Sequence, residues 1–264
     1  MLPKNLLYQN KLAAAPAQSY STLISPTSGN GPYSFTGGVS STIIINIPTG
    51  GNRVLNPADT YLKFEVSVTN QAQTQYIRFG SAGAHGIFQR LRLFHTGLLE
   101  DLDEYGLLAS KMLVHTCPGD AFSGRQNILL GLSPETSVGG DISIRTIASP
   151  TGMNWNKSTT GALSANQTLK QTFTVSLLSI IGTLTDKYLP LFDMGAAPLR
   201  LELTTVSDAN KAFNFQAGYA SAATINKVEL CAAFIDLSDM TIAQLRASRG
   251  GMPLQMVIPS YRTY

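Results

Sequence analysis

The stretch Gly86–His115, GIFQRLRLF-HTG-LLEDLDEYGLLASKMLVH, changes its hydrophobic period halfway along. In Ile87–Phe94 apolar residues alternate with Arg90 and Arg92, which is the two-residue period of a half-buried strand. After the short HTG link, apolar residues recur at steps of three and four, which is the period of a helix: Leu98, Leu99, Leu102, Tyr105, Leu108, Met112 and Leu113. The stretch therefore predicts a strand that runs into a helix over Leu98–His115.

The ends of this predicted helix carry suitable charges and a cap. Thr96 is placed to cap its first turn, and Lys111 and His115 lie near its carboxyl end. Acidic residues are concentrated near its amino end, where a helix dipole favours negative charge: Glu100, Asp101, Asp103 and Glu104.

Strand patterns dominate the rest of the chain. Tyr61–Thr69 alternates cleanly, and Ala223–Leu237 is a long strand that could carry a bulge between Ile225 and Val228, with Ile225, Val228 and Leu230 facing inward. Asn56-Pro57 predicts a turn, and Gly80–Gly86 (GSAGAHG) predicts a flexible link. Further strands are expected at Ser41–Pro48, Gln75–Phe79, Ile128–Leu132, Asp141–Ile147, Thr172–Ile181, from Leu199 onward and at Pro253–Pro259.

The order of elements predicts an all-β fold: an antiparallel jelly-roll β-sandwich with an inserted helix and a short C-terminal helix. About eight strands joined by long connections are typical of Greek-key sandwiches and jelly rolls. Residues 1–39 lack periodicity and predict an extended N-terminal arm, and 40–237 form the jelly-roll domain. Residues 238–264 hold a helix capped by Asp239, followed by the start of a second roll or a C-terminal arm.

A low charge content suits a protein whose surface is largely covered by neighbours, and it also suits a secreted β-protein. Charged residues make up 13% of the 264 residues, against roughly 25% in ordinary soluble domains. The net charge of +3 is spread along the chain, which argues against a nucleic-acid-binding arm, because phosphate neutralisation needs clustered Lys and Arg. No apolar run is long enough to span a bilayer, and the N-terminus is not typical of a signal peptide.

The two cysteines, Cys117 and Cys231, are too few for a disulfide framework. We expect both to be reduced and the chain to be made in a reducing compartment; a single bridge between them is the alternative. The spacing of the cysteines and of the three histidines matches no metal-site motif, so no metal or cofactor is expected.

Candidate chemical sites each have a simpler explanation. The acidic cluster Glu100–Glu104 could offer metal ligands, but a solvated helix terminus explains it better. Cys117 with His95 or His115 could form a thiol–imidazole pair, yet no oxyanion-hole sequence accompanies it.

Other single residues are equally weak indicators of chemistry. His85 lies in a glycine-rich link that lacks the Lys-Ser/Thr of a phosphate-binding loop. Arg78, Arg90 and Arg92 could line a surface that touches nucleic acid, whereas polar strand faces or subunit contacts are the commoner role. We interpret Trp155 and Tyr264 as packing or interface anchors, and we expect no catalytic site and no enzyme activity.

Two segments resemble a known family. GLLEDLDEYGLL (Gly97–Leu108) and PLFDMGAAPLRLELTTVS (Pro190–Ser207) are similar to segments in the first half of the major capsid proteins of the double-jelly-roll virus lineage. The order that follows, a long strand, a short helix, Gly-Gly and a new strand, is also similar. The resemblance covers roughly residues 40–264, although family members carry two rolls and only one is evident here.

The resemblance implies a function in assembly. It implies a viral capsid protein, made in the host cytoplasm or nucleus, that forms trimeric, pseudo-hexameric capsomers in an icosahedral shell. Its partners would be copies of itself and neighbouring capsid proteins, with no sequence-specific nucleic acid; whether a membrane lies beneath the shell stays open. The alternatives are a single-roll minor or vertex protein, a carbohydrate-binding adhesive module, and a hydrolase on a jelly-roll scaffold.

Overall fold

The computed structural model describes residues 17–69, 77–79, 82–116, 118, 168–183, 187–195, 197–215, 222–248, 250 and 252. In these ranges no helix is both long and apolar enough to cross a membrane. Several predicted features lie outside the described residues: the strands Ile128–Leu132, Asp141–Ile147 and Pro253–Pro259, and the anchors Trp155 and Tyr264.

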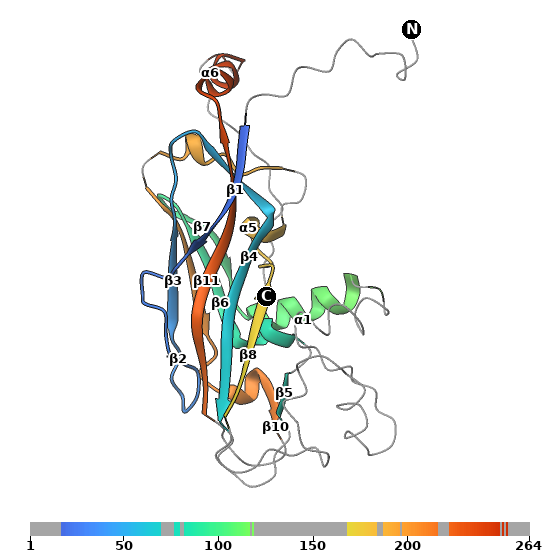
Figure 1. Ribbon diagram of the computed structural model, residues 1–264. Helices are drawn as coiled ribbons and strands as arrows, with labels where there is room; N and C mark the ends of the chain where they lie inside the picture. Colours follow the sequence, from blue (N-terminus) through green and yellow to red (C-terminus); the bar gives the residue numbers. More distant parts are fainter. Residues whose placement is uncertain are drawn as a thin grey trace.

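Two antiparallel sheets form the body of the molecule (Figure 1). The first has the order β1 (Ala17–Ile24), β11 (Ala222–Leu237), β4 (Arg53–Thr69) and β8 (Thr168–Val175), and β2 (Tyr33–Ser34) also pairs with β11. The second has the order β3 (Thr42–Ile47), β9 (Leu199–Thr205), β6 (Phe88–Phe94) and β7 (Leu98–Leu102). A separate pair joins β5 (Ile77–Phe79) to β10 (Phe213–Phe215).

The strand order is that of a jelly roll. When the strands of the two main sheets, the short β2 aside, are lettered B to I along the chain, the sheets become B-I-D-G and C-H-E-F. Apart from the β6–β7 hairpin, neighbouring strands in these sheets are not consecutive in sequence, as nested Greek keys require. The predicted fold class, an antiparallel jelly-roll sandwich, is confirmed.

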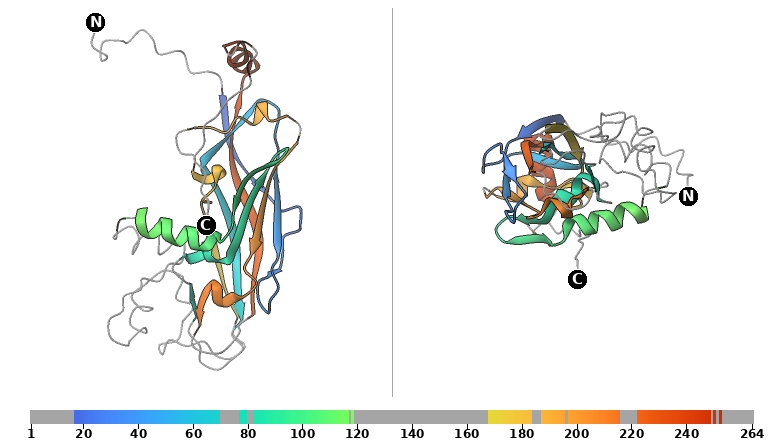
Figure 2. Two further views of the ribbon diagram at one scale, coloured as in Figure 1. Left: turned by 180° about the vertical axis from the view of Figure 1, so that it is seen from behind. Right: turned by 90° about the horizontal axis from the view of Figure 1, so that it is seen from below.

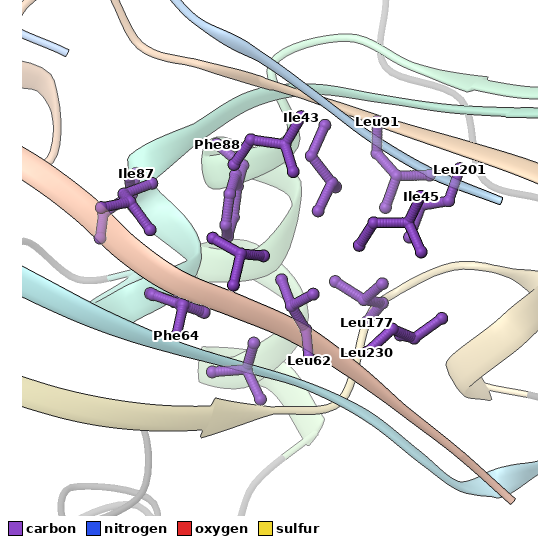
Figure 3. Close-up of a cluster of buried hydrophobic side chains, with 14 of the residues drawn as sticks. Ile43, Ile45, Leu62, Phe64, Ile87, Phe88, Leu91, Leu177, Leu201 and Leu230 are labelled. Carbon is purple, nitrogen blue, oxygen red and sulfur yellow. The ribbon is translucent and has the colours of Figure 1, made fainter. Parts of the chain in front are cut away.

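The hydrophobic core lies between the two sheets (Figure 3). Phe64 of β4 meets Phe88 of β6 edge to face across the sandwich, with ring centroids 5.4 Å apart. Both side chains are fully buried, as are the inward residues Ile43, Ile45, Leu62, Leu91, Leu201 and Leu230. Buried and less buried residues alternate along each strand because successive side chains point to opposite sides of the sheet.

The register between the two longest strands, β4 and β11, shifts at two places that the local sequence indicates. The register of β11 against β4 shifts between Asn226 and Glu229, and Lys227 there has a positive φ of 50°, which confirms the predicted bulge. Asn56-Pro57 is no strand boundary but lies inside β4. The register shifts again opposite these residues, and the Asn56 side chain accepts a hydrogen bond from the Ala58 backbone, so an Asx turn bulges the strand without ending it.

The predicted helix over Leu98–His115 is wrong in its first third. Leu98–Leu102 is strand β7, and helix α1 spans only Tyr105–Thr116, so Thr96 caps nothing. The carbonyl of Glu104 accepts the first helical hydrogen bonds, from the backbones of Leu107 and Leu108. Because α1 follows β7 so closely, the apolar residues of strand and helix together imitate one long helical stripe. Figure 2 shows α1 projecting sideways from the sandwich.

Three further expectations are corrected. The segment 1–39 is not an arm throughout, because it contains β1 and β2, both paired with β11. The described part of the glycine-rich link is no flexible tether: Gly83–Ile87 is a buried 3-10 helix, η3. The strand expected to reach Ile181 stops at Val175 and gives way to the one-turn helix α5 (Ile180–Thr183).

The C-terminal helix is confirmed as α6 (Asp239–Ser248), at one end of the sandwich (Figure 1). Its cap is Ser238 rather than Asp239, because the Ser238 hydroxyl accepts a hydrogen bond from the Thr241 backbone. Only Ile242 of this helix is buried, against Val54 and Phe192; Phe192 lies in the 3-10 helix η5 (Leu191–Asp193). The 3-10 helix η6 (Ala209–Lys211) precedes β10.

Candidate functional site

The four acidic residues predicted to crowd one helix terminus have separate surroundings. Asp103 and Glu104 precede α1, where they match its dipole as expected. Glu100 and Asp101 lie on β7 and, as neighbours on a strand, point to opposite faces. Glu100 points into the core and is 3% exposed, whereas Asp101 points outward.

Glu100 fastens the segment that follows β8. Its Oε2 accepts hydrogen bonds from the Ser179 hydroxyl at 2.6 Å and from the Ile180 backbone at 3.1 Å. Burial raises the pKa of the Glu100 carboxyl, an effect that these two hydrogen bonds oppose. Its second oxygen, Oε1, is buried with no hydrogen-bond partner among the described residues.

Tyr105 and His85 form a second buried contact beside the first. The Tyr105 hydroxyl accepts a hydrogen bond from the Leu178 backbone at 2.9 Å and lies 3.3 Å from Nδ1 of His85. Burial lowers the pKa of His85 to about 4 and raises the pKa of Tyr105. The imidazole is therefore neutral at physiological pH.

These two contacts hold the interior together and do not form a reaction centre. His85 is 3% exposed and Tyr105 is fully buried, so neither meets a solvent-borne substrate. The hydrogen bond from Leu178 to Tyr105 and the one from Ile180 to Glu100 attach the backbone of Leu178–Ile180 to α1 and to β7. The phosphate-loop alternative for His85 is wrong for the same reason, since the side chain faces Tyr105 and not solvent.

The outer face of the second sheet carries a ladder of paired charges. Arg90 of β6 donates two hydrogen bonds to Asp101 of β7, at 2.8 and 2.6 Å, and this pairing holds the pKa of the Asp101 carboxyl below its usual range. On β9, Glu202 lies between Arg92 and Arg200, with N–O distances of 2.9 and 3.1 Å.

Phe94 completes this ladder. The guanidinium of Arg200 lies over its ring at 4.6 Å and that of Arg92 at 5.6 Å. Because Arg90 and Arg92 are each engaged by a carboxylate, the polar strand face fits them better than a nucleic-acid surface. The third arginine of that hypothesis, Arg78, lies on β5, outside this sheet.

The remaining candidate residues are not brought together. His95 lies in the turn between β6 and β7, and His115 is exposed near the end of α1. Cys231 is a buried free thiol on β11, while Cys117 lies outside the described residues. In the described part of the chain, no group of three His, Cys, Asp or Glu side chains could hold a metal ion.

Exposed apolar side chains are the surface feature that sequence patterns missed. Most lie on β1, β7, α1, the link before η5, and α6, and each is at least 41% exposed: Leu23, Val39, Leu98, Leu99, Leu107, Tyr188, Met240, Leu245 and Met252. Contiguous exposed apolar patches commonly mark contacts with other proteins, whereas single exposed apolar residues occur on most surfaces. Leu98 and Leu99 are apolar in the sequence, but the helical period predicted there places them on a buried stripe.

Comparisons with known proteins agree with this architecture. No protein-family model matches the sequence, and no curated protein matches it. A chain of the Sputnik virophage structure superposes with a TM-score of 0.53 at 8% identity, over 90% of this chain and 52% of its own. The PBCV-1 virus capsid superposes with a TM-score of 0.52 at 13% identity, over 88% of this chain and 45% of its own.

The structure of PBCV-1 VP54, fitted into a reconstruction of the virophage Sputnik, gives a TM-score of 0.50 at 13% identity, with the same coverage. The chain thus spans about half the length of the capsid chains it matches. At these identities the likeness concerns the fold. It confirms the resemblance predicted from the sequence at that level: the chain has the jelly-roll fold found in the capsid proteins of double-jelly-roll viruses.

Proposed function

We propose that this chain is a structural subunit of a viral capsid, and that it acts by assembling with copies of itself rather than by catalysis. The observation that supports the proposal is the B-I-D-G and C-H-E-F strand order, which superposes on capsid structures over about nine-tenths of the chain. The proposed location is the virion.

The surface chemistry supports the same proposal. Only 13% of residues are charged, and charges are depleted at the cores of protein interfaces. The main polar clusters described above are internal or paired, so they stabilise the fold and leave no evident reaction centre among the described residues. Exposed leucines on β1, β7 and α1 provide apolar area for contacts between subunits.

The assembly unit that we propose is a trimeric capsomer, and many such capsomers would tile an icosahedral shell. A trimer offers six jelly rolls when each subunit contributes two, and three when it contributes one. The chain spans about half the length of the matched capsid chains, and one roll is described in it. A second roll in each subunit, which a six-roll capsomer requires, is therefore itself a proposal.

Light scattering on the purified full chain, at rising concentration, tests the proposal. We expect a species of three times the 28.3 kDa chain mass, and larger shells by electron microscopy. Leu107→Gln, which changes an exposed residue of α1, tests whether exposed apolar area contributes; Thr172→Gln, on the exposed side of β8, is the matched control. A monomer that persists at high concentration would contradict the proposal, and binding on a glycan array would favour an adhesive module instead.

A further inference from the structure

Apart from the two-residue β2, the two main sheets end in four edge strands, and three of these are protected against pairing with other chains. Edge strands are blunted by charges, by inward-pointing charged residues or by a covering segment. On β7, Glu100 points inward and Asp101 outward. On β8, Lys170 is exposed.

The edge of β3 has no charge but is covered by its own chain. The backbone N–H of Thr27 donates to the carbonyl of Ile44 at 2.8 Å, and the Ile44 N–H donates to the Ser28 hydroxyl at 3.1 Å. The segment after β1 therefore occupies both backbone groups of Ile44, in the middle of the β3 edge, and blocks continuous pairing of that edge with another strand.

The fourth edge strand, β1, has none of these protections. Its eight residues, AQSYSTLI, include no charge, no proline and no glycine. It pairs with β11 along its whole length, and among the described residues nothing pairs with its other side. In a strand paired on one side only, alternate backbone N–H and C=O groups remain available on the other.

The side chains of β1 are compatible with a sheet that continues beyond it. Tyr20 and Ile24 pack against the core, whereas the outward face is small and exposed: Ala17, Ser19, Ser21 and Leu23. Leu23 is 54% exposed, so a neighbouring strand would also bury apolar area there.

We propose that the open edge of β1 pairs with β1 of a second copy of this chain, antiparallel, so that the two five-stranded sheets become continuous. A strand without charge pairs with its own copy without like-charge repulsion, which would oppose pairing of two β7 or two β8 edges. The inference rests on the proposed function, because a single strand pair is a small interface that gains strength from many simultaneous contacts.

Symmetry restricts the register. Two residues that lie directly opposite each other point to the same face of the sheet. A two-fold axis places the odd-numbered residues of both copies on one face, so an odd-numbered residue lies opposite an odd-numbered one and an even-numbered residue opposite an even-numbered one. The two central registers place Ser21 opposite Ser21 of the other copy, or Tyr20 opposite Tyr20. In the second register Ser19 faces Ser21 of the other copy.

Cysteine cross-linking of the full chain tests the pairing directly. We expect a disulfide-linked dimer either from Ser21→Cys alone or from a mixture of the Ser19→Cys and Ser21→Cys proteins. Thr172→Cys on β8 is the matched control, because it is exposed on an edge strand that carries a lysine. Absence of both cross-links at concentrations where the wild-type chain assembles would overturn the inference; their absence in a chain that never assembles would overturn it together with the proposed function.

Charge substitution separates this contact from the capsomer itself. The double variant S19K/S21K should keep the trimer but lose assemblies larger than the trimer, while T172K/T174K on β8 should resemble wild type. Unchanged thermal unfolding of both variants establishes that they fold. If S19K/S21K forms the same large assemblies as wild type, the β1 contact is wrong and the proposed capsid function stands; if wild type forms no trimer, the proposed function fails whatever the cross-links show.

Discussion

Two buried titratable residues, His85 and Glu100, respond to pH in opposite directions. Burial lowers the pKa of the first and raises the pKa of the second, because in each case the interior disfavours the charged form. As the pH falls, His85 therefore lowers the free energy of unfolding, whereas protonation of Glu100 removes the cost of burying its charge.

For His85 the effect can be assigned a size. Its pKa falls from 6.5 to about 4 on folding, so the unfolded chain binds the proton first as the pH drops. The free energy of unfolding should be unaffected above pH 6.5 and should fall by about 3 kcal/mol between pH 6.5 and 4. Urea denaturation of wild type and His85→Asn at pH 7 and pH 5 measures it. Between pH 7 and pH 5 the free energy of unfolding should fall by about 2 kcal/mol more for wild type than for the variant. Equal losses would contradict the assignment.

Glu100 should tolerate loss of its charge but not loss of its oxygens. Glu100→Gln keeps an acceptor for the Ser179 hydroxyl and the Ile180 backbone, so we expect unfolding free energies within about 1 kcal/mol of wild type at pH 7. Glu100→Ala leaves both donors buried and unpaired and should cost about 1–3 kcal/mol. Denaturant titration of both proteins decides; equal stability of the two variants would mean that the hydrogen bonds contribute little.

At the scale of elements, the short helix α5 is held by a close backbone approach. A Cβ added at Gly182 would lie 2.0 Å from the carbonyl oxygen of Leu177. Gly182→Ala should therefore force the α5 backbone to shift and cost about 1–3 kcal/mol. Gly97, in the turn between β6 and β7, has no atom within 4 Å of the same position, so Gly97→Ala should change stability by less than about 0.5 kcal/mol. Thermal unfolding of the two variants compares them, and equal melting temperatures would refute the predicted clash.

Local sequence predicted most strands correctly and failed where two elements meet. The boundary between β7 and α1 was missed because Leu102 and Tyr105 fall at a helical spacing across it. The strand pattern within LLEDL was hidden by Glu100, since an inward-facing position was occupied by a carboxylate. The partner that makes this position tolerable, Ser179, is distant in sequence, so no local window contains the information.

At the scale of the whole molecule, the two sheets should unfold as one unit, because their inner faces form a single apolar cluster. Phe64 is fully buried, and its ring contacts Phe88 of the opposite sheet and Phe173 of its own. Phe64→Ala should cost about 3–5 kcal/mol and lower the melting temperature of one common transition. Calorimetry measures this, with the exposed Thr172→Ala as control; two separate transitions would contradict a shared core.

The amino-acid sequence by itself determined the fold class, most strand positions, the bulge in β11 and the C-terminal helix. Those features follow from period-two alternation and from turn and cap residues, all of which act over a few neighbouring positions. Only the tertiary structure decided that part of 1–39 completes a sheet, that Glu100 is internal, and that β1 is an edge strand among the described residues. Each of these depends on which distant strand lies alongside, and pairing between strands far apart in the chain leaves no local trace in the sequence.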